Sequence, residues 1–440
     1  MRRQHTTNRE RGRARRVAAV LGALTAAVAF AAPASAAVAP DPDFGGSGLV
    51  LTDFAGGEDA AEAVAIAPGG TVLAAGFGEL GDPERPHVAG FAFARHLGTG
   101  APDPSFSGDG RTLADFGFVN QSAEAVAVGT GGDAVAAGTI TTFDGTTSSI
   151  GVARLRPDGT PDPEFGDHGL VVLHPGTLCT VGDVAIDDHG RPVILAAASS
   201  SRGFRPLVIR LRTDGTIDPS FGSGGMSRFG KPFADLYDAL AVDGRGRLLL
   251  GGMAPRRAGS PGPAVRRMKA SGELDSGYGK GGIARPLGGG DGELADIALD
   301  GARVVAAATC ACEGGRDDDI AIARLAPNGR RDRSFGEGGR SVIAYGAKDA
   351  EATSVAIDPE GRAIAGGSVR IGGDEVWALV RVGAGGDPDP SFGPGGRISS
   401  DVGPGVDGVR DLAVDAESRI YAVGLGAGPD GSDFAVARFR

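Results

Sequence analysis

The stretch "DPDPSFGPGG" at 387–396 returns in nearly the same form as "DPSFSGDG" at 103–110 and "DPSFGSGG" at 218–225. Its aromatic residue marks seven positions along the chain, separated by steps of 62, 59, 56, 57, 57 and 57 residues. The markers are Phe44, Phe106, Phe165, Phe221, Tyr278, Phe335 and Phe392. A regular period indicates one supersecondary unit repeated along the chain. We therefore expect residues 37–440 to form a single domain of seven repeats.

Two further positions keep step with the aromatic residue in all seven repeats. A Gly follows it by four residues, which favours a backbone with positive φ or a neighbour too close for a Cβ. An Asp precedes it by three residues, usually as Asp-Pro, which suits a tight turn. These residues are Asp41, Asp103, Asp162, Asp218, Asp275, Asp332 and Asp389. The aromatic ring is expected to plug the edge of the core, where its burial contributes about 1.5–3 kcal/mol.

The segments between the markers have the pattern of short strands. Each contains an apolar–Ala–apolar triplet such as "VAI" at 64–66, then a turn and a second small apolar strand. A loop of variable length leads to a third strand, such as "IAIARL" at 320–325, and the repeated Gly begins a fourth. This alternation has a period of two, which is typical of strands. The sequence therefore predicts an all-β fold, a seven-bladed β-propeller of four-stranded antiparallel blades. A linear solenoid would need distinct capping units, and none is visible.

The two ends of the chain indicate how the ring closes. The third strand of each repeat carries an Arg, and the first six lie eight residues before the next Asp of the repeated phrase. These residues are Arg95, Arg154, Arg210, Arg267, Arg324, Arg381 and Arg438. Arg438 has no Asp after it, and Asp41 has no Arg before it. We therefore predict that the N-terminal strand pairs with the C-terminal strands. A sevenfold array of catalytic pairs would be unusual chemistry, so we assign both sets a structural role.

The phrase "DPSFG…G", preceded by "ARL…DG" and followed by "VAI…G", resembles the delta-60 repeat family of secreted and surface proteins of bacteria. The resemblance extends over about residues 40–440 and implies a β-propeller domain of unknown function. It brings no established catalytic residues. The repeat with "ELDSGYG" at 273–279 departs most from the pattern, because it lacks the Pro and the Phe.

The first 36 residues are predicted to be a signal peptide. A basic stretch with seven Arg is followed by the apolar "VAAVLGALTAAVAF" and the small residues "APASA". We expect cleavage after Ala36, with Ala39 as second choice, and favour the general export route over a twin-arginine route through Arg15-Arg16. The protein is expected to be secreted, extracellular or periplasmic, without a membrane span.

The charge of the chain bears on its partners. The formal net charge of −11 becomes about −17 once residues 1–36 are removed, since they carry seven Arg and one Glu. An acidic surface argues against nucleic acid, which requires clustered Lys and Arg. We expect a monomer that binds an unknown protein or carbohydrate ligand.

Signatures of catalysis are not found in the sequence. The His residues at 87, 96, 168, 174 and 189 have no metal-ligand spacing and are interpreted as scattered loop residues. No G-x-S-x-G motif occurs, and we predict no catalytic, cofactor or metal residues. Cys310 and Cys312 are a possible disulfide or soft-metal site, although we favour a pair of reduced or incidentally oxidised thiols.

The loops between second and third strands vary most and should share one face with the links between blades. Binding in repeat proteins usually lies where insertions collect. Charged residues expected on this face are Asp82, Glu84, Arg85, Asp144, Arg256, Arg257, Asp317, Asp318, Asp319, Asp374 and Glu375. Our leading hypothesis is a secreted, non-catalytic binding or surface-interaction module, with no cluster of perturbed acids in the central channel. The alternative is an extracellular hydrolase or lyase acting on a carbohydrate or small polar substrate, which needs converging carboxylates at the channel mouth.

Overall fold

The computed structural model describes residues 38–440 with short gaps. The gaps are residues 82–87, 143, 202, 233–234, 257–260, 313–317, 347–348, 402–407 and 429–430. The expected signal peptide therefore lies outside the described residues. The same is true of Asp82, Glu84, Arg85, His87, Arg257 and Asp317.

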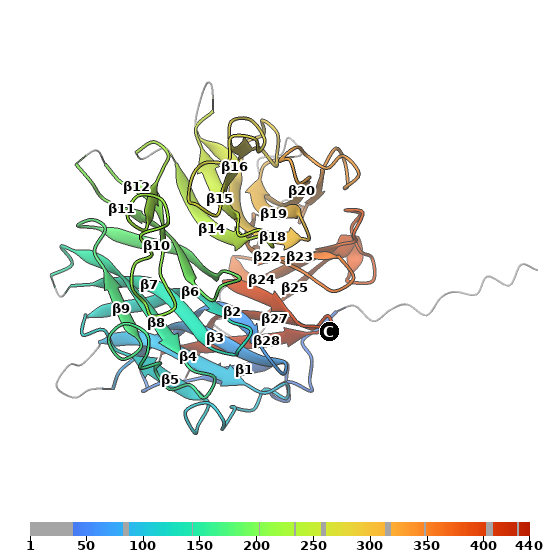
Figure 1. Ribbon diagram of the computed structural model, residues 1–440. Coiled ribbons are helices and arrows are strands. Elements are labelled where there is room, and N and C mark those ends of the chain that lie inside the picture. Colours follow the sequence, from blue (N-terminus) through green and yellow to red (C-terminus); the bar gives the residue numbers. More distant parts are fainter. Residues whose placement is uncertain are drawn as a thin grey trace, which may run out of the picture. The chain divides into compact units, whose positions relative to one another are not determined.

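Seven antiparallel sheets of four strands each follow one another around a ring (Figure 1). Blade 1 consists of β2 (Ala60–Ala67), β3 (Thr71–Glu79), β4 (Ala89–His96) and β5 (Arg111–Ala114). Blade 2 consists of β6 (Asn120–Val128), β7 (Ala134–Thr141), β8 (Ser148–Leu155) and β9 (Leu170–Leu173). Blade 3 consists of β10 (Cys179–Ile186), β11 (Pro192–Ala198), β12 (Arg205–Arg210) and β13 (Met226–Arg228).

The remaining blades repeat the same order. Blade 4 consists of β14 (Leu236–Val242), β15 (Leu248–Ala254), β16 (Gly262–Met268) and β17 (Ile283–Ala284). Blade 5 consists of β18 (Glu293–Asp300), β19 (Arg303–Cys310), β20 (Asp319–Leu325) and β21 (Arg340–Ile343). Blade 6 consists of β22 (Ala350–Ile357), β23 (Ala363–Ile371), β24 (Asp374–Val382) and β25 (Arg397–Ser400). Blade 7 consists of β26 (Asp411–Val414), β27 (Ile420–Ala427), β28 (Ser432–Phe439) and β1 (Leu49–Thr52). The predicted seven-bladed all-β propeller is confirmed.

The ring closes as the terminal residues predicted. The blue strand β1 lies beside the red strand β28 in Figure 1, with Leu49 opposite Ala437 and Thr52 opposite Phe434. Blade 7 therefore takes its outer strand from the N-terminal end and its three inner strands from the C-terminal end. The described residues contain one short 3-10 helix, η1 (Pro394–Gly396), and no helix among them is long and apolar enough to cross a membrane.

The first strand of each blade lies innermost, because each first strand contacts the first strands of both neighbouring blades. In blades 1 to 6 this strand carries a one-residue β-bulge at the same position. A bulge turns side chains away from the regular alternation and often lies next to a functional site. The bulged residues are Glu62, Glu124, Gly182, Asp238, Ala295 and Thr353.

The marker aromatic residues fill the seams between blades. Each is at most 1 % exposed. The Gly four residues later has a positive φ in every repeat, between 73° and 100°. At Gly110 a Cβ would also lie 2.9 Å from the backbone nitrogen of Asp103. The turn therefore requires Gly for both expected reasons: its backbone has a positive φ, and a neighbouring backbone leaves no room for a Cβ.

Candidate functional site

Each repeat Arg lies beside its repeat Asp in a cluster that we call the clasp: the Arg, the Asp and the marker aromatic residue. The closest nitrogen–oxygen distance in each pair lies between 2.6 and 2.9 Å in six of the seven clasps, and Arg154 with Asp162 forms the remaining pair. Each guanidinium also lies over the marker ring, 4.3 to 5.2 Å from its centroid, at a distance typical of cation–π contacts. The clasp therefore joins the third strand of a blade to the turn that follows it.

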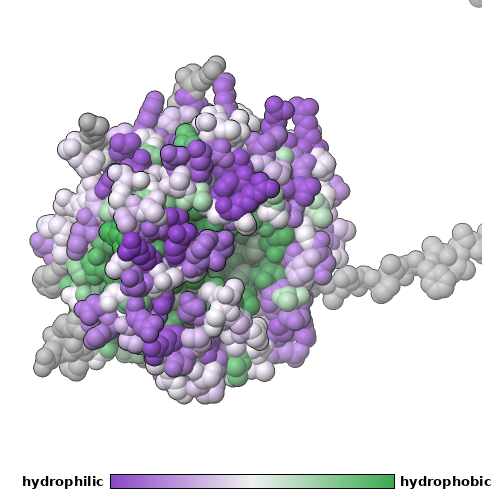
Figure 2. Space-filling model, viewed as in Figure 1, coloured by the Kyte–Doolittle hydropathy of each residue, from purple (hydrophilic) through white to green (hydrophobic). Residues whose placement is uncertain are grey.

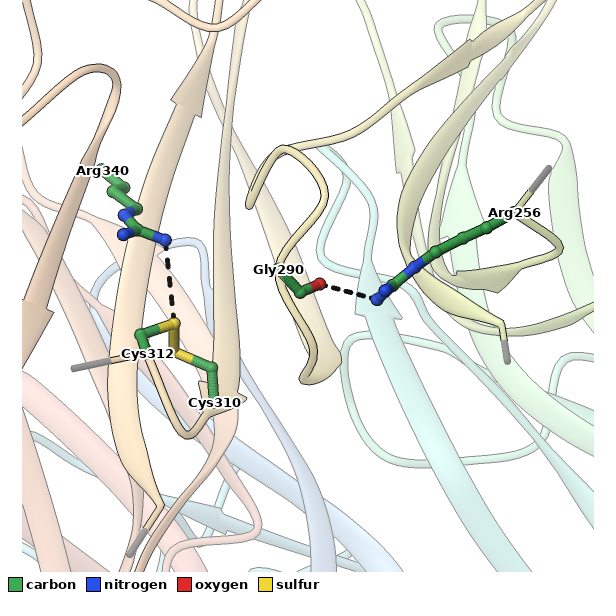
Figure 3. Close-up of a disulfide and its surroundings, with 5 residues drawn as sticks. All are labelled: Arg256, Gly290, Cys310, Cys312 and Arg340. Carbon is green, nitrogen blue, oxygen red and sulfur yellow. Dashed lines mark hydrogen bonds between the residues drawn. A yellow bond between two sulfur atoms is a disulfide. The ribbon is translucent and has the colours of Figure 1, made fainter. Parts of the chain in front are cut away.

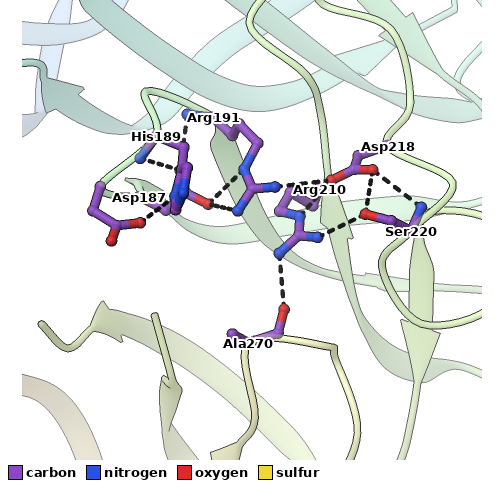
Figure 4. Close-up of polar contacts among 8 residues, drawn as sticks. Asp187, His189, Arg191, Arg210, Asp218, Ser220 and Ala270 are labelled. Carbon is purple, nitrogen blue, oxygen red and sulfur yellow. Dashed lines mark hydrogen bonds and ion pairs between the residues drawn. The ribbon is translucent and has the colours of Figure 1, made fainter. Parts of the chain in front are cut away.

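The clasp also reaches the next blade, as blade 3 shows (Figure 4). Arg210 donates from Nε to Asp218 at 2.8 Å and from Nη1 to the carbonyl oxygen of Ala270, in blade 4, at 2.8 Å. Burial acts to raise the pKa of Asp218, but hydrogen bonds from Ser220 and Arg210 outweigh it, so that this pKa lies below its usual value. In blade 3 all three guanidinium nitrogens of Arg210 and both carboxylate oxygens of Asp218 thus have hydrogen-bond partners.

The central channel contains a cluster of acids, so our prediction of a channel without perturbed acids was wrong. The first strands of the seven blades line a cavity of about 270 Å³. Hydrophilic side chains gather around the middle of the ring, beside a hollow with apolar walls (Figure 2). The acids that line the channel are Glu62, Glu124, Asp183, Asp238, Asp296 and Asp411. Arg410 is the one basic residue among the described residues of this lining.

Three of these acids, Asp183, Asp296 and Asp411, form what we call the latches between blades. Asp183 accepts from the N–H of Val184 at 2.7 Å and from the N–H of Leu240, in the next blade, at 2.6 Å. Asp296 accepts from the N–H of Ile297 and Val355 at 2.6 and 2.8 Å. Asp411 accepts from the N–H of Leu412 and Val64 at 2.8 and 2.9 Å. One carboxyl group thus satisfies a donor in each of two adjacent blades.

The latches are half-buried in the channel wall, and their surroundings shift their pKa values. Burial raises the pKa of Asp183 well above its usual value, and the nearby charge of Asp296 adds to the shift. Burial and the charge of Asp411 raise the pKa of Asp296 to about 7. Burial also raises the pKa of Asp411. Because every oxygen of the three carboxyl groups already accepts a hydrogen bond, we interpret them as structural.

A cavity of about 700 Å³ lies on the loop face between blades 1 and 2. We call it the blade 1–2 pocket. As expected from the alternation of turns, it is bordered both by a link between blades, at 56–58, and by the ends of second strands. Its lining is Gly56, Gly57, Glu58, Phe77, Glu79, Ala89, Asn120, Gln121, Ser122, Glu124, Thr139 and Thr141. Sites for small molecules usually have volumes of about 300–1,000 Å³ and combine apolar walls with a few fixed polar groups.

Glu124 is the deepest titratable group of this pocket and is shared with the channel. The bulge of β6 directs it there, and Thr139 donates to its Oε2 from the backbone N–H at 2.6 Å and from the hydroxyl at 3.1 Å. Burial raises the pKa of Glu124 to about 8, with a smaller contribution from the charge of Glu62. At neutral pH this side chain is therefore mostly a neutral carboxylic acid that donates as well as accepts.

The polar rim of the pocket is held in place by the link segments. Gln121 accepts from the N–H of Phe116 at 2.6 Å and donates to Asp115 at 2.8 Å and to the carbonyl oxygen of Phe118 at 2.9 Å. Asp59 accepts from the N–H of Phe54 at 2.7 Å and of Glu79 at 3.0 Å. The rim is thus preorganised before any ligand arrives.

The loop-face residues named from the sequence are distributed rather than gathered. Asp144 accepts from Thr142 and Thr146 within its own hairpin, and Arg256 binds Asp291 at 2.8 Å. Asp318 and Glu375 line a second cavity of about 330 Å³. Asp319 begins β20 and Asp374 begins β24. The interpretation of the His residues as loop residues was wrong for His96, which is buried in β4 beside the hydroxyl of Thr52 at 3.1 Å.

Two groups of three acidic or His side chains in the described part of the chain lie close enough to hold a metal ion. They are Asp187, Asp188 and His189, and Asp53, Asp59 and Asp433. Asp187 already pairs with Arg191, and both oxygens of Asp59 accept backbone hydrogen bonds. In each group one carboxylate therefore already has partners within the protein.

Glu124 and the latches were not among the residues predicted from the sequence. The three latch Asp residues directly precede the apolar–Ala–apolar triplet, as in "GDVAI" at 182–186. Glu124 lies two residues before its triplet, in "EAVAV" at 124–128. An acid inside an otherwise apolar strand is the signal that identifies them, because a charge is rarely placed there without a partner.

Comparisons with known proteins agree with the propeller. The family model described as a domain of unknown function (DUF5122) beta-propeller matches residues 135–165, 193–221 and 359–392. No curated protein matches the chain.

Among solved structures, Semaphorin 2a of Drosophila is similar at 9% identity with a TM-score of 0.50, over 89% of this chain and 75% of its own. A catalytically inactive virginiamycin B lyase from Staphylococcus aureus has 9% identity and a TM-score of 0.47, over 88% and 98%. An alpha-l-arabinofuranosidase from Fusarium graminearum has 12% identity and a TM-score of 0.42, over 89% and 96%. At these identities the likeness concerns the fold alone. Together, the family-model matches and the seven blades support a β-propeller repeat family.

Proposed function

We propose that this protein is a secreted, non-catalytic binding module that takes a neutral oligosaccharide in the blade 1–2 pocket. The observation that carries the proposal is the pocket itself, which combines a volume of about 700 Å³ with hydroxyl, amide and carboxyl groups around the apolar Phe77 and Ala89. Sugars offer adjacent donors and acceptors together with apolar C–H faces, and this lining matches both. The signal peptide expected from the sequence supports export.

The charge of the pocket supports a neutral rather than an anionic ligand. Among the described residues, its lining includes Glu58, Glu79 and Glu124 but no Lys or Arg. An anionic ligand would lose its water without gaining a counter-charge, which is costly. The protonated form of Glu124 donates to a sugar hydroxyl without adding a charge at the pocket floor.

A hydrolase is the second candidate, because a carboxylic acid with a raised pKa is what a general acid needs. Hydrolysis of a glycosidic bond also requires an ionised partner carboxylate, so that the environments of the two groups push their pKa values apart. The pKa of Glu62, the acid coupled to Glu124, is instead raised as well, chiefly by burial. Glu62 and Glu124 therefore do not form such an acid and base pair, which favours binding over hydrolysis.

Calorimetric titration with neutral and with acidic oligosaccharides, together with an assay for released reducing ends, tests this function. We expect binding of a neutral sugar without turnover, and at least about tenfold weaker binding of a uronic acid counterpart. Release of reducing ends that stops in Glu124→Gln would favour the hydrolase. Absence of binding to any neutral sugar would remove the proposal.

A further inference from the structure

Cys310 and Cys312 form a disulfide at the loop-face end of blade 5 (Figure 3). The two Cα atoms are 5.1 Å apart, and Ala311 alone separates the residues. Cys310 ends β19 and is 1 % exposed, surrounded by the apolar side chains of Leu287, Ala308, Ala321 and Ala323. Cys312 is half-buried. The two sulfur atoms therefore differ in environment, and only that of Cys312 is open to an incoming reagent.

A positive charge lies beside the more accessible sulfur. Nη1 of Arg340, the first residue of β21, is 3.9 Å from Sγ of Cys312. A neighbouring guanidinium favours the thiolate form of a cysteine, whereas an apolar environment disfavours it. On reduction, the guanidinium therefore favours ionisation of Cys312 over that of Cys310, which lies among apolar side chains. Such an asymmetry in access and charge directs thiol–disulfide exchange to one of the two sulfur atoms.

The other side of the pair is covered by the preceding blade. Arg256 donates to the carbonyl oxygen of Gly290 at 2.6 Å and fixes the segment before β18 (Figure 3). A Cβ on Gly292 in that segment would lie 2.9 Å from Cβ of Cys310. Access from this side is closed, which directs any attack to Cys312.

The cross-link adds little to the fold. The stabilisation from a disulfide grows with the length of the loop that it closes, and here the loop contains a single residue between the two cysteines. The four strands of blade 5 pair with one another independently of the disulfide. Opening and reforming this bond is therefore compatible with an intact propeller.

We propose that Cys310–Cys312 is a thiol–disulfide exchange site that oxidises an accessible polypeptide dithiol. A substrate thiolate attacks Sγ of Cys312, the S–S bond breaks, and its electron pair passes to Sγ of Cys310, which takes up a proton. The second substrate thiolate then attacks the substrate sulfur of the mixed disulfide and releases Cys312 as a thiolate beside Arg340. Two substrate thiols become a disulfide, the protein becomes a dithiol, and a second, external disulfide reoxidises it by the reverse steps.

Trapping the mixed disulfide tests the assignment of the attacked sulfur. Cys310→Ser and Cys312→Ser are each incubated with oxidised glutathione, and adducts are quantified by peptide mass spectrometry. We expect the adduct on Cys312 in the first variant to form at least about tenfold faster than the adduct on Cys310 in the second. Cys179 is buried and serves as the internal control that stays unmodified. Equal rates for the two variants, or modification of Cys179 at the same rate, overturn the proposal.

The role of Arg340 and the complete reaction have their own measurements. Arg340→Gln should slow the adduct on Cys312 several-fold and Arg340→Lys should restore it, while Arg330→Gln, at an exposed Arg in the turn after β20, should leave the rate unchanged. Unmodified protein mixed with a reduced dithiol peptide should yield one peptide disulfide per chain. Protein that is reduced and alkylated beforehand should yield none. A peptide that stays reduced would contradict the proposed exchange reaction. So would a disulfide whose reduction lowers the melting temperature but which does not exchange with the peptide. The test uses blade 5 only, so its outcome is independent of sugar binding.

Discussion

Asp41 and Arg438 form an ion pair in which Oδ2 and Nη2 are 2.6 Å apart and the two side chains are 1 % and 4 % exposed. The pair joins the turn that begins at Asp41, before β1, to the end of β28. In the other six blades the Arg and the Asp of the clasp are eight residues apart in the sequence. In blade 7 the same clasp joins the two ends of the chain and so closes the ring. The other Arg near this Asp, Arg440, is half-exposed.

Replacing Arg438 with Ala should weaken closure of the ring. The variant leaves Asp41 charged and buried without its main partner, which costs about 3–5 kcal/mol in comparable buried pairs. We expect a lower urea midpoint and faster proteolysis near β1. Arg440→Ala is the matched control and should cost at most about 1 kcal/mol, since that side chain is half-exposed. Equal effects of the two substitutions would show that the clasp does not hold the ring closed.

Removing a latch should destabilise the seam between two blades. Asp183→Ala leaves the N–H groups of Val184 and Leu240 without their carboxylate acceptor. Each buried donor that loses its partner costs about 1–3 kcal/mol, so the urea midpoint should fall clearly. Asp167→Ala, at a side chain that is 97% exposed, should change the free energy of unfolding by no more than about 0.5 kcal/mol. A latch variant as stable as this control would contradict a structural role.

The inner acids should make the protein less stable as the pH rises. Burial raises the pKa of Glu124 from 4.5 to about 8 and that of Asp296, together with the charge of Asp411, from 3.8 to about 7. The folded state then binds more protons than the unfolded state between about pH 4 and pH 8, so the free energy of unfolding declines across this range. Glu124→Gln removes one of these groups and should show a smaller decline in urea unfolding measured at several pH values. Glu58→Gln, an exposed residue of the same pocket, should leave the decline unchanged.

The clasps should set the acid limit of stability. Because hydrogen bonds from Ser220 and Arg210 lower the pKa of Asp218, its contribution is present above the unfolded value of 3.8 and is lost as the pH falls through the lower folded value. Ser220→Ala removes a 2.7 Å hydrogen bond to Asp218 and should move acid unfolding to a higher pH, followed by circular dichroism. Ser223→Ala, at an exposed serine in the next turn, is the control. An unchanged acid midpoint in Ser220→Ala would contradict this account.

Filling the blade 1–2 pocket should abolish sugar binding without unfolding the protein. Thr141 is half-buried at the end of β7 and lines the pocket, so Thr141→Trp occupies space that the ligand needs. We expect at least about tenfold weaker binding by calorimetry, with the melting temperature nearly unchanged. Thr146→Trp lies in the exposed hairpin tip outside the pocket lining and should bind as the parent does. Binding that survives in Thr141→Trp would place the ligand elsewhere.

The sequence by itself determined the blades, their number and their closure. The positions that carry this information act locally: Arg210, Asp218 and Phe221 lie within twelve residues of one another and meet in one clasp. Because the same local arrangement recurs seven times, the repeat can be distinguished from a chance pattern in a Gly-rich and Asp-rich sequence. Asp41 has no preceding Arg and Arg438 has no following Asp, and this pattern predicted that the two ends of the chain meet.

Only the tertiary structure decided the chemistry of the channel and of the pocket. Asp183 finds its second donor on Leu240, and Asp411 finds its own on Val64 across the closure of the ring. The pKa of Glu124 depends on burial created by strands from several blades, and the pocket lies between two of them. Desolvation and the pairing of charges are properties of the assembled ring, since no segment alone removes water from these groups.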